Sequence, residues 1–241
     1  MKLIIIRHAD PDYENDSLTI KGKEEAAALA SYLKNETFDA VYSSPLGRAK
    51  ETCMAVQREN GFTFTELPWL REFNAHIELP YLDEPTYCWD LLPGYVADHP
   101  RVFDRGEAWM SDETFRGSDV REKWERVKRG LDDLLATHGY VHDGYLYRVK
   151  KPNRDTVVLF CHFGITAVML SILTGASPYV FWQHFCSLPT SYTTLVTEER
   201  EEGIASFRCI GFGDLSHLAI AGQKPSFSAR FCETYDSDER H

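Results

Sequence analysis

The sequence predicts an α/β fold: a three-layer sandwich in which a mostly parallel sheet carries helices on both faces, with a cap-like insertion. Two observations support this prediction. Apolar, β-branched runs at residues 2–6 and 156–161 are typical of strands that are buried on both faces. Amphipathic helical segments alternate with such strands along the chain, which is the pattern of parallel strands joined by crossover helices.

The length of 241 residues favours one large domain with a sizeable insertion. We predict a single domain over residues 1–241, with an insertion at about residues 74–152 and a polar, acidic tail at about residues 225–241. No internal repeat or low-complexity tract divides the chain. Its 6 widely spaced cysteines, without any Cys-x-x-Cys pair, predict reduced, mostly buried thiols of a cytoplasmic protein and no zinc site.

The first part of the chain is predicted to form two strand–helix units. Residues 2–6 form the first strand, a polar loop covers residues 10–17, and a helix is expected over residues 21–34. A short strand at residues 38–42 precedes a second helix, for which Ser44 is a candidate cap and Pro45 a candidate first residue. This helix should end near Arg58, before Gly61. Residues 62–67 are a candidate third strand.

The rest of the chain begins with an irregular, aromatic-rich segment from about residue 74 to residue 116, whose rings we interpret mainly as packing within a cap. Residues 120–137 form the clearest helix of this region, followed by a small hairpin at residues 140–149. The strand at residues 156–161 leads into a helix at residues 164–173, which Gly175 closes. Two final strands, at residues 193–197 and 204–212, are joined by a charged turn.

Polar side chains follow four of the predicted strands, at the point where each strand ends. They are Arg7 and His8, then Arg48 in the first turn of the second helix, then Glu72, and finally His162. Because ligands of such sheets bind beyond the carboxyl ends of the strands, we expect these side chains to share one rim.

This combination of side chains suits phosphoryl transfer. The planar fork of arginine matches phosphate oxygens, and a neutral imidazole is a competent nucleophile toward phosphorus near pH 7. A carboxylic acid can protonate the leaving oxygen and later deprotonate water. The helix that follows His162 adds backbone N–H donors for an anion, including that of Phe163. No metal is needed if the arginines hold the developing charge.

Five ordered motifs carry a family resemblance. They are Arg7-His8 after a strand, Leu18-Thr19 with Gly22, Ser43-Ser44-Pro45-Leu46 with Arg48, Leu70-Arg71-Glu72, and the late His162. With this set the chain resembles the phosphoglycerate mutase-like branch of the histidine phosphatase superfamily, over roughly residues 1–75 and 155–220. The resemblance implies a metal-independent phosphomonoester hydrolase that uses no cofactor.

The resemblance also implies residue roles. His8 matches the residue that becomes phosphohistidine, and Glu72 matches the proton donor and acceptor. Arg7, Arg48 and His162 match the residues that grip the phosphoryl group.

Four features depart from the family pattern. Ala9 and Phe163 stand where the family usually has glycine after the first and second histidines. Asn15 lies nearest to the family's asparagine, offset by one residue, and the segment after Glu72 lacks a Gly-Trp-Glu-Gly-like pattern. These departures leave the substrate undetermined.

The formal net charge of −11 argues against nucleic acid or an anionic membrane as a partner, because the summed field repels a polyanion. No apolar stretch approaches the ~20 residues that cross a bilayer. We expect a small phosphorylated substrate in a locally positive pocket, and we leave the oligomeric state open. Three alternatives stay open: phosphoglycerate mutase-type phosphoryl transfer, a non-catalytic phospho-ligand binding module, and a structural protein that docks through its aromatic insertion.

Overall fold

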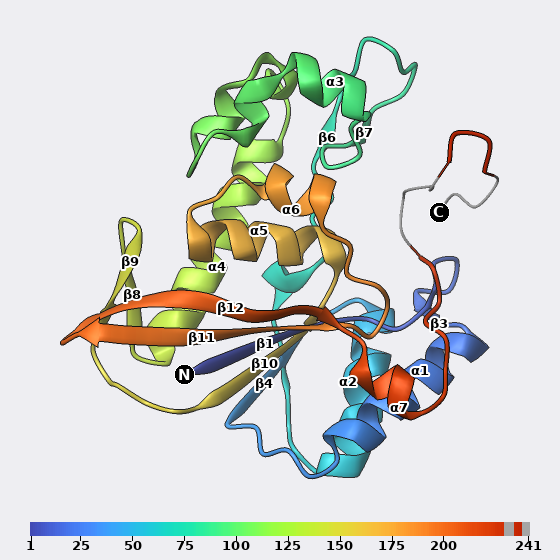
Figure 1. The fold of residues 1–241 in the computed structure, drawn as a ribbon, viewed down its shortest axis with the longest axis vertical. Helices are drawn as coiled ribbons and strands as arrows, with labels where there is room; N and C mark the ends of the chain where they lie inside the picture. Colours follow the sequence, from blue (N-terminus) through green and yellow to red (C-terminus); the bar gives the residue numbers. More distant parts are fainter. Residues whose placement is uncertain (229–233, 238–241) are drawn as a thin grey trace.

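A computed structural model describes residues 1–228 and 234–237. At its centre lies a sheet of 8 strands in the order β5-β4-β10-β1-β11-β12-β9-β8 (Figure 1). Strands β5, β4, β10 and β1 are parallel, and an antiparallel half continues from β11. The α/β class with a parallel core is therefore confirmed. The bounds are β1 Lys2–Arg7, β4 Ala40–Ser43, β5 Thr65–Glu66, β8 Tyr140–Asp143, β9 Leu146–Val149, β10 Thr156–Cys161, β11 Tyr192–Glu201 and β12 Ile204–Asp214.

Helices cover both faces of this sheet (Figure 1). One face carries α1 (Ile20–Leu33), α2 (Gly47–Asn60) and α7 (Ser216–Ile220), and the other carries α4 (Val120–Thr137), α5 (Phe163–Thr174) and α6 (Pro178–His184). The alternation of side chains along β1 explains the two layers. Leu3 and Ile5 enter the larger core with α4 and α5, whereas Ile6 enters the core formed with α1 and α2.

The start of α2 corrects the prediction for the second helix. The helix begins at Gly47 with Leu46 as its N-cap, so Ser44 and Pro45 lie outside it. The Gly47 N–H instead donates to a carboxylate oxygen of Asp16 at 2.7 Å. A Cβ atom at Gly47 would lie 2.0 Å from the Asp16 carbonyl oxygen, so only glycine permits this approach. A loop distant in sequence therefore caps α2, which a local motif could not reveal.

Several other boundaries differ from the prediction. The strand expected at residues 62–67 is reduced to β5, which pairs with β4 at the sheet edge through only two residues. Helices α6 and α7 were not predicted, although Ser177 followed by Pro178 is a recognisable start signal for α6. Strands β11 and β12 are longer than expected because they pair with each other along most of their length.

The predicted insertion has two parts. The first lies beyond α5 and α6 in Figure 1 and holds Trp109, which is fully buried and packs edge-on against Trp124 and Tyr179. The second part, α4 with the β8–β9 hairpin, joins the layers of the main sheet. The single-domain assignment stays a prediction.

The short elements of the chain are β2 Pro11–Asp12, β3 Ser17–Leu18, η1 Pro68–Leu70, β6 His76–Ile77, β7 Thr86–Tyr87, α3 Pro93–Asp98, η2 Pro100–Phe103, η3 Ala108–Ser111 and η4 Glu113–Phe115.

The cysteines only partly match the expectation of buried thiols. Cys53, Cys88 and Cys161 are buried and free, whereas Cys186 and Cys209 are free and exposed. Cys232 lies outside the described residues, as does much of the tail predicted at residues 225–241. Within residues 1–228 and 234–237, no helix combines the length and the apolarity that a membrane crossing needs.

Candidate active site

Four of the predicted side chains meet at the carboxyl edge of the parallel strands. Arg7 of β1 pairs in register with Cys161 of β10, so Arg7-His8 and His162 leave neighbouring strands together. The rings of His8 and His162 lie 5.1 Å apart between centroids. Arg48 reaches the same place from α2, which follows β4, the other neighbour of β10. All four side chains are buried, with at most 9% of each residue exposed.

His8 is held as a neutral imidazole with one defined tautomer. Its Nδ1 lies 2.7 Å from the Ala9 carbonyl oxygen, which can only accept, so Nδ1 carries the proton. Nε2 then carries the lone pair. Burial lowers the pKa of His8 well below its usual value, and the charges of Arg7 and Arg48 lower it further. The imidazole is therefore uncharged and nucleophilic at neutral pH.

The two arginines leave positive charge inside the protein. Arg48 pairs with Asp16 through Nη1 at 2.6 Å and lies 5.3 Å from the centre of the Tyr13 ring. Among residues 1–228 and 234–237, Arg7 donates to two backbone carbonyls, from Nη1 to Ser187 and from Nη2 to Ser228, each at 2.6 Å. The Nε atoms of both arginines are buried and make no hydrogen bond within the described part of the chain. These donors suit an anion.

His162 is the second neutral imidazole of the site. Its Nε2 lies 2.8 Å from the Ser44 hydroxyl, and its Nδ1 is buried with no hydrogen-bond partner among residues 1–228 and 234–237. Burial lowers the pKa of His162 well below the usual value, with further lowering from His8 and the neighbouring arginines. Ser44, which sequence reasoning assigned to a helix cap, thus orients a site histidine.

Glu72 approaches the site from the loop after η1. Its Oε1 accepts the N–H groups of Phe73 at 2.7 Å and Ile165 at 3.0 Å, which fixes the carboxyl against the first turn of α5. A Cβ atom at Gly164 would lie 2.7 Å from Oε1, so glycine is required for this approach. Burial raises the pKa of Glu72, and the N–H donors oppose that rise. A raised pKa favours the protonated form that a general acid needs.

Phe163 is the first residue of α5, so its N–H lies at the helix start as expected. Its ring stands edge-on to Trp89 at 6.4 Å, which makes an aromatic wall beside the site. The Trp89 indole donates to the Phe73 carbonyl at 3.1 Å, next to Glu72. Sequence reasoning did not assign Trp89, because its position within the irregular insertion gave no periodic signal.

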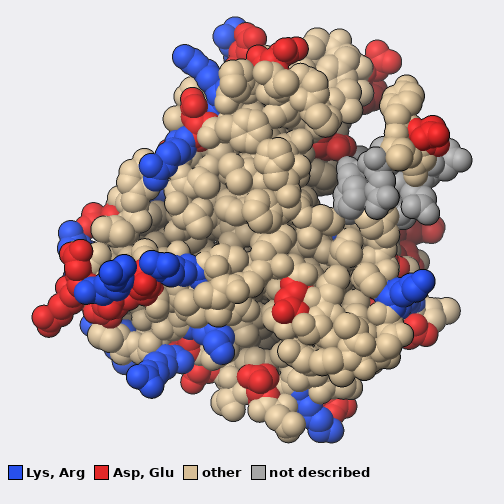
Figure 2. Space-filling view, viewed as in Figure 1, with Lys and Arg blue, Asp and Glu red and all other residues tan. Residues whose placement is uncertain are grey.

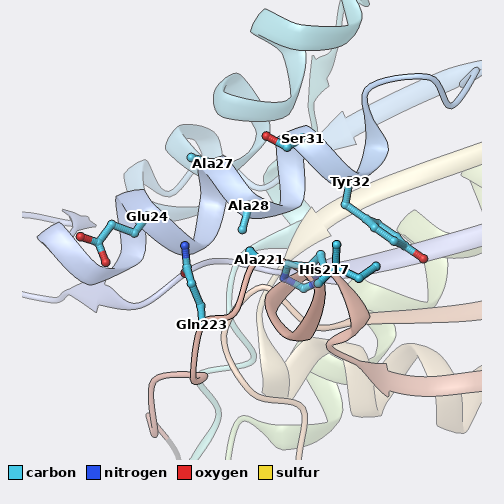
Figure 3. Close-up of a pocket in the computed structure, with 9 residues that line it drawn as sticks. Glu24, Ala27, Ala28, Ser31, Tyr32, His217, Ala221 and Gln223 are labelled. Carbon is cyan, nitrogen blue, oxygen red and sulfur yellow. The ribbon is translucent and has the colours of Figure 1, made fainter.

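A separate pocket of about 500 Å³ lies between α1 and α7 (Figure 3). Tyr32, His217 and Gln223 line it together with several alanines, and none of the predicted site residues does. His217 is buried, and burial lowers its pKa to about 4. The pocket holds no arginine or lysine among its lining residues, so it is not built for a phosphoryl group.

A match to a family model shows which superfamily the chain belongs to. A model of the histidine phosphatase superfamily (branch 1) matches residues 3–209. The chain belongs to this superfamily. It is 25% identical over 214 residues to phosphoserine phosphatase 1 of Hydrogenobacter thermophilus, which covers 85% of this chain and 90% of that protein. The predicted family is confirmed, and phosphomonoester hydrolysis agrees with it.

Solved structures share the fold of this histidine phosphatase. A phosphoserine phosphatase from Entamoeba histolytica covers 90% of this chain and 98% of its own, at 19% identity and a TM-score of 0.58. A mycobacterial glucosyl-3-phosphoglycerate phosphatase covers 88% and 98%, at 19% identity and a TM-score of 0.59. A phosphoglycerate mutase from Bacillus anthracis str. Sterne covers 92% and 97%, at 18% identity and a TM-score of 0.60.

The departures from the superfamily pattern lie at the edge of the site. Ala9 is fully buried, and its N–H donates to the Thr52 hydroxyl at 3.0 Å. Asn15 is exposed and binds Asp12 through its side chain at 2.8 Å, so it does not join the buried cluster. Its neighbour Asp16 instead pairs with Arg48. Among the described residues, no group of three or more His, Cys, Asp or Glu side chains could hold a metal ion.

Proposed function

We propose that this histidine phosphatase hydrolyses small phosphomonoesters through a phosphohistidine formed on Nε2 of His8. The observation that carries the proposal is the buried cluster of one neutral imidazole, with its lone pair on Nε2, beside two arginines and a second neutral imidazole. Such a site attracts an anion and presents a nucleophile to it without first having to remove a proton.

In the first step, Nε2 of His8 attacks phosphorus and forms a P–N bond while the P–O bond to the leaving alcohol breaks. Arg7, Arg48 and His162 hold the phosphoryl oxygens and stabilise the charge that spreads over them. Glu72 gives its proton to the leaving oxygen, a role that its raised pKa supports. The phosphoryl group then resides on His8.

In the second step, water attacks the phosphohistidine and the P–N bond breaks. The Glu72 carboxylate, which lost its proton in the first step, takes one from the attacking water and returns to its starting state. His8 regains a neutral ring, and inorganic phosphate is the product. The two steps together use the same five side chains with no net change in the protein.

The substrate in this proposal is a small phosphorylated metabolite met in the cytoplasm, without nucleic acid or membrane partners. The net charge of −11 supports a small ligand, because a large polyanion is repelled before it reaches the buried arginines. In Figure 2, charged side chains lie mainly around the outline of the molecule, and the broad central face is largely uncharged. Phosphoserine and phosphoglycerates are candidate substrates, because similar proteins are named as phosphatases of phosphoserine and of glucosyl-3-phosphoglycerate.

A phosphate-release screen tests this proposal. Sugar phosphates, nucleotides, phosphoserine, phosphoglycerates and phosphopeptides are offered to the wild type, with His8→Ala as the blank. We expect release from at least one small phosphomonoester and none from the blank. Equal release from both proteins would contradict the proposal, and binding without release would favour a non-catalytic phospho-ligand module. Transfer of the trapped phosphoryl group to a phosphoglycerate, in place of water, would favour the mutase alternative.

A further inference from the structure

Glu25 is a buried carboxylate that the proposed mechanism does not use. It lies in α1, is fully buried, and makes no ion pair with the described residues. Its two oxygens accept backbone N–H groups from distant segments, Asp10 at 3.1 Å and Ser226 at 2.7 Å. A buried charge is costly unless it is compensated by hydrogen bonds. These two N–H groups are therefore the partners that stabilise the carboxylate.

The bond to Ser226 fixes the segment of residues 225–228, which we call the strap. The strap follows α7 and passes the start of α1 (Figure 1). Just before the strap in the sequence, the side-chain oxygen of Gln223 lies 3.5 Å from Nζ of Lys21 in α1. Two residues beyond Ser226, the Ser228 carbonyl accepts from Nη2 of Arg7 at 2.6 Å. A single carboxylate therefore connects the strap to a residue of the phosphoryl site.

The strap and the Ser187 loop hold the Arg7 guanidinium from two sides. Nη1 donates to the Ser187 carbonyl and Nη2 to the Ser228 carbonyl, so both terminal nitrogens are anchored and the plane of the group is set. A guanidinium has five N–H groups in a fixed fork, so about three of them, including that on Nε, remain for another acceptor. The strap therefore orients Arg7 without using up its donors.

We propose that Glu25 is a positioning residue, which anchors the strap so that the Ser228 carbonyl orients Arg7 toward the phosphoryl group. The inference rests on the proposed function, because it takes Arg7 to bind phosphate. Glu25 also holds the N–H of Asp10, two residues after His8, so the same carboxylate ties the loop of the nucleophile to the strap. If the strap instead shielded Arg7 from the substrate, removing the strap would raise the phosphatase activity.

The test compares Glu25→Gln with Glu24→Gln, a neighbouring exposed position on the same helix that loses the same charge. The N–H groups of Asp10 and Ser226 bind different oxygens of Glu25, and glutamine replaces one of these oxygens with an NH2 group, so one of the two hydrogen bonds is lost. For each variant we measure KM and kcat with p-nitrophenyl phosphate and the inhibition constant of inorganic phosphate. We expect Glu25→Gln to raise KM and the phosphate inhibition constant about tenfold, the effect of a misplaced charged hydrogen bond. Glu24→Gln should match the wild type.

Two further variants keep the proposal falsifiable if Glu25→Gln folds poorly. Ser226→Pro removes the N–H that Glu25 accepts together with the serine hydroxyl, so Ser226→Ala, which keeps the N–H, is its control. A chain ending at Lys224 removes the strap and the residues after it while leaving Glu25 intact. Ser226→Pro and the shortened chain should both weaken phosphate affinity as Glu25→Gln does. In an Arg7→Ala background, neither should have any further effect, because no guanidinium remains to be oriented.

Several outcomes would overturn the inference. These are unchanged phosphate affinity in Ser226→Pro and the shortened chain, a gain in activity on losing the strap, or equal losses with and without Arg7. The proposed function can fail independently. A wild type that releases no phosphate contradicts the function itself, whereas activity that requires His8 but ignores the strap variants contradicts only the role of Glu25.

Discussion

The active-site edge and the pocket of Figure 3 each contain a buried histidine in a similar local setting. His162 and His217 both place Nε2 next to a hydroxyl, that of Ser44 and of Thr190, and both have a buried Nδ1 without a hydrogen bond among the described residues. Burial lowers the pKa of each ring. A buried imidazole with a shifted pKa therefore does not by itself mark a catalytic site.

The charges around the two rings make the difference. Arginines and a second histidine surround His162 and lower its pKa further, whereas the charged neighbour of His217 is Asp214, which opposes the lowering. At the active-site edge, Arg7 donates to two backbone carbonyls and forms no ion pair with the residues that the structure describes. We conclude that the excess of buried cations, rather than the histidine, distinguishes the phosphoryl site from the pocket.

The largest predicted effect separates the two regions directly. His8→Ala removes the nucleophile and should lower kcat with p-nitrophenyl phosphate by at least about a thousandfold. His217→Gln keeps an N–H donor for Thr190, so we expect kcat/KM to stay within about twofold of the wild type, with a lower Tm from disturbed packing. Phosphate-release kinetics and thermal unfolding measure both. A His217→Gln variant as inactive as His8→Ala would remove the distinction between the regions.

Glu72→Gln should have the next largest effect. Glutamine can still accept the N–H groups of Phe73 and Ile165, but it cannot supply a proton, so we expect a loss of about a hundredfold for an alkyl phosphate such as β-glycerophosphate. The loss should be smaller for p-nitrophenyl phosphate, whose leaving group needs less protonation. Steady-state rates on the two substrates give the comparison. Equal losses on both substrates would mean that Glu72 is not the proton donor.

Arg48→Ala should weaken phosphate binding about tenfold to a hundredfold, because it removes a buried cation with its hydrogen bonds. Arg58→Ala, an exposed position near the end of the same helix, is the matched control and should have no measurable effect. The inhibition constant of inorganic phosphate checks both variants. Similar weakening in the two variants would point to a general charge effect instead of a site contact.

The smallest predicted effect is the pH dependence. The lowered pKa of His8 keeps the ring neutral as the pH falls, and the raised pKa of Glu72 keeps the carboxyl protonated to higher pH than usual. We therefore expect kcat/KM not to fall between pH 7.5 and pH 6, where an imidazole of ordinary pKa would lose about three quarters of its neutral form. In Arg48→Ala the pKa of His8 should rise, so an acid loss should appear in the pH profile.

The sequence was sufficient for the parts of the site that follow directly from strands. Arg7-His8 and His162 come straight after apolar runs, and parallel strands bring their carboxyl ends to one edge, so their meeting follows from the fold class. Glu72 was placed in the same way through its motif. Contacts made by irregular chain were not accessible, because Asp16 and Trp89 reach the site from loops whose paths periodicity does not encode.

By itself, the sequence determined the superfamily, the α/β core and the five side chains assigned to phosphoryl transfer, since ordered motifs and strand patterns are local properties. Only the tertiary structure decided what holds those side chains. It decided that a distant Asp16 caps α2 and pairs with Arg48, and that Glu25 connects the strap to Arg7. The physical reason is that a buried charge or N–H takes its partner from whichever segment packs beside it, and that segment need not be close in sequence.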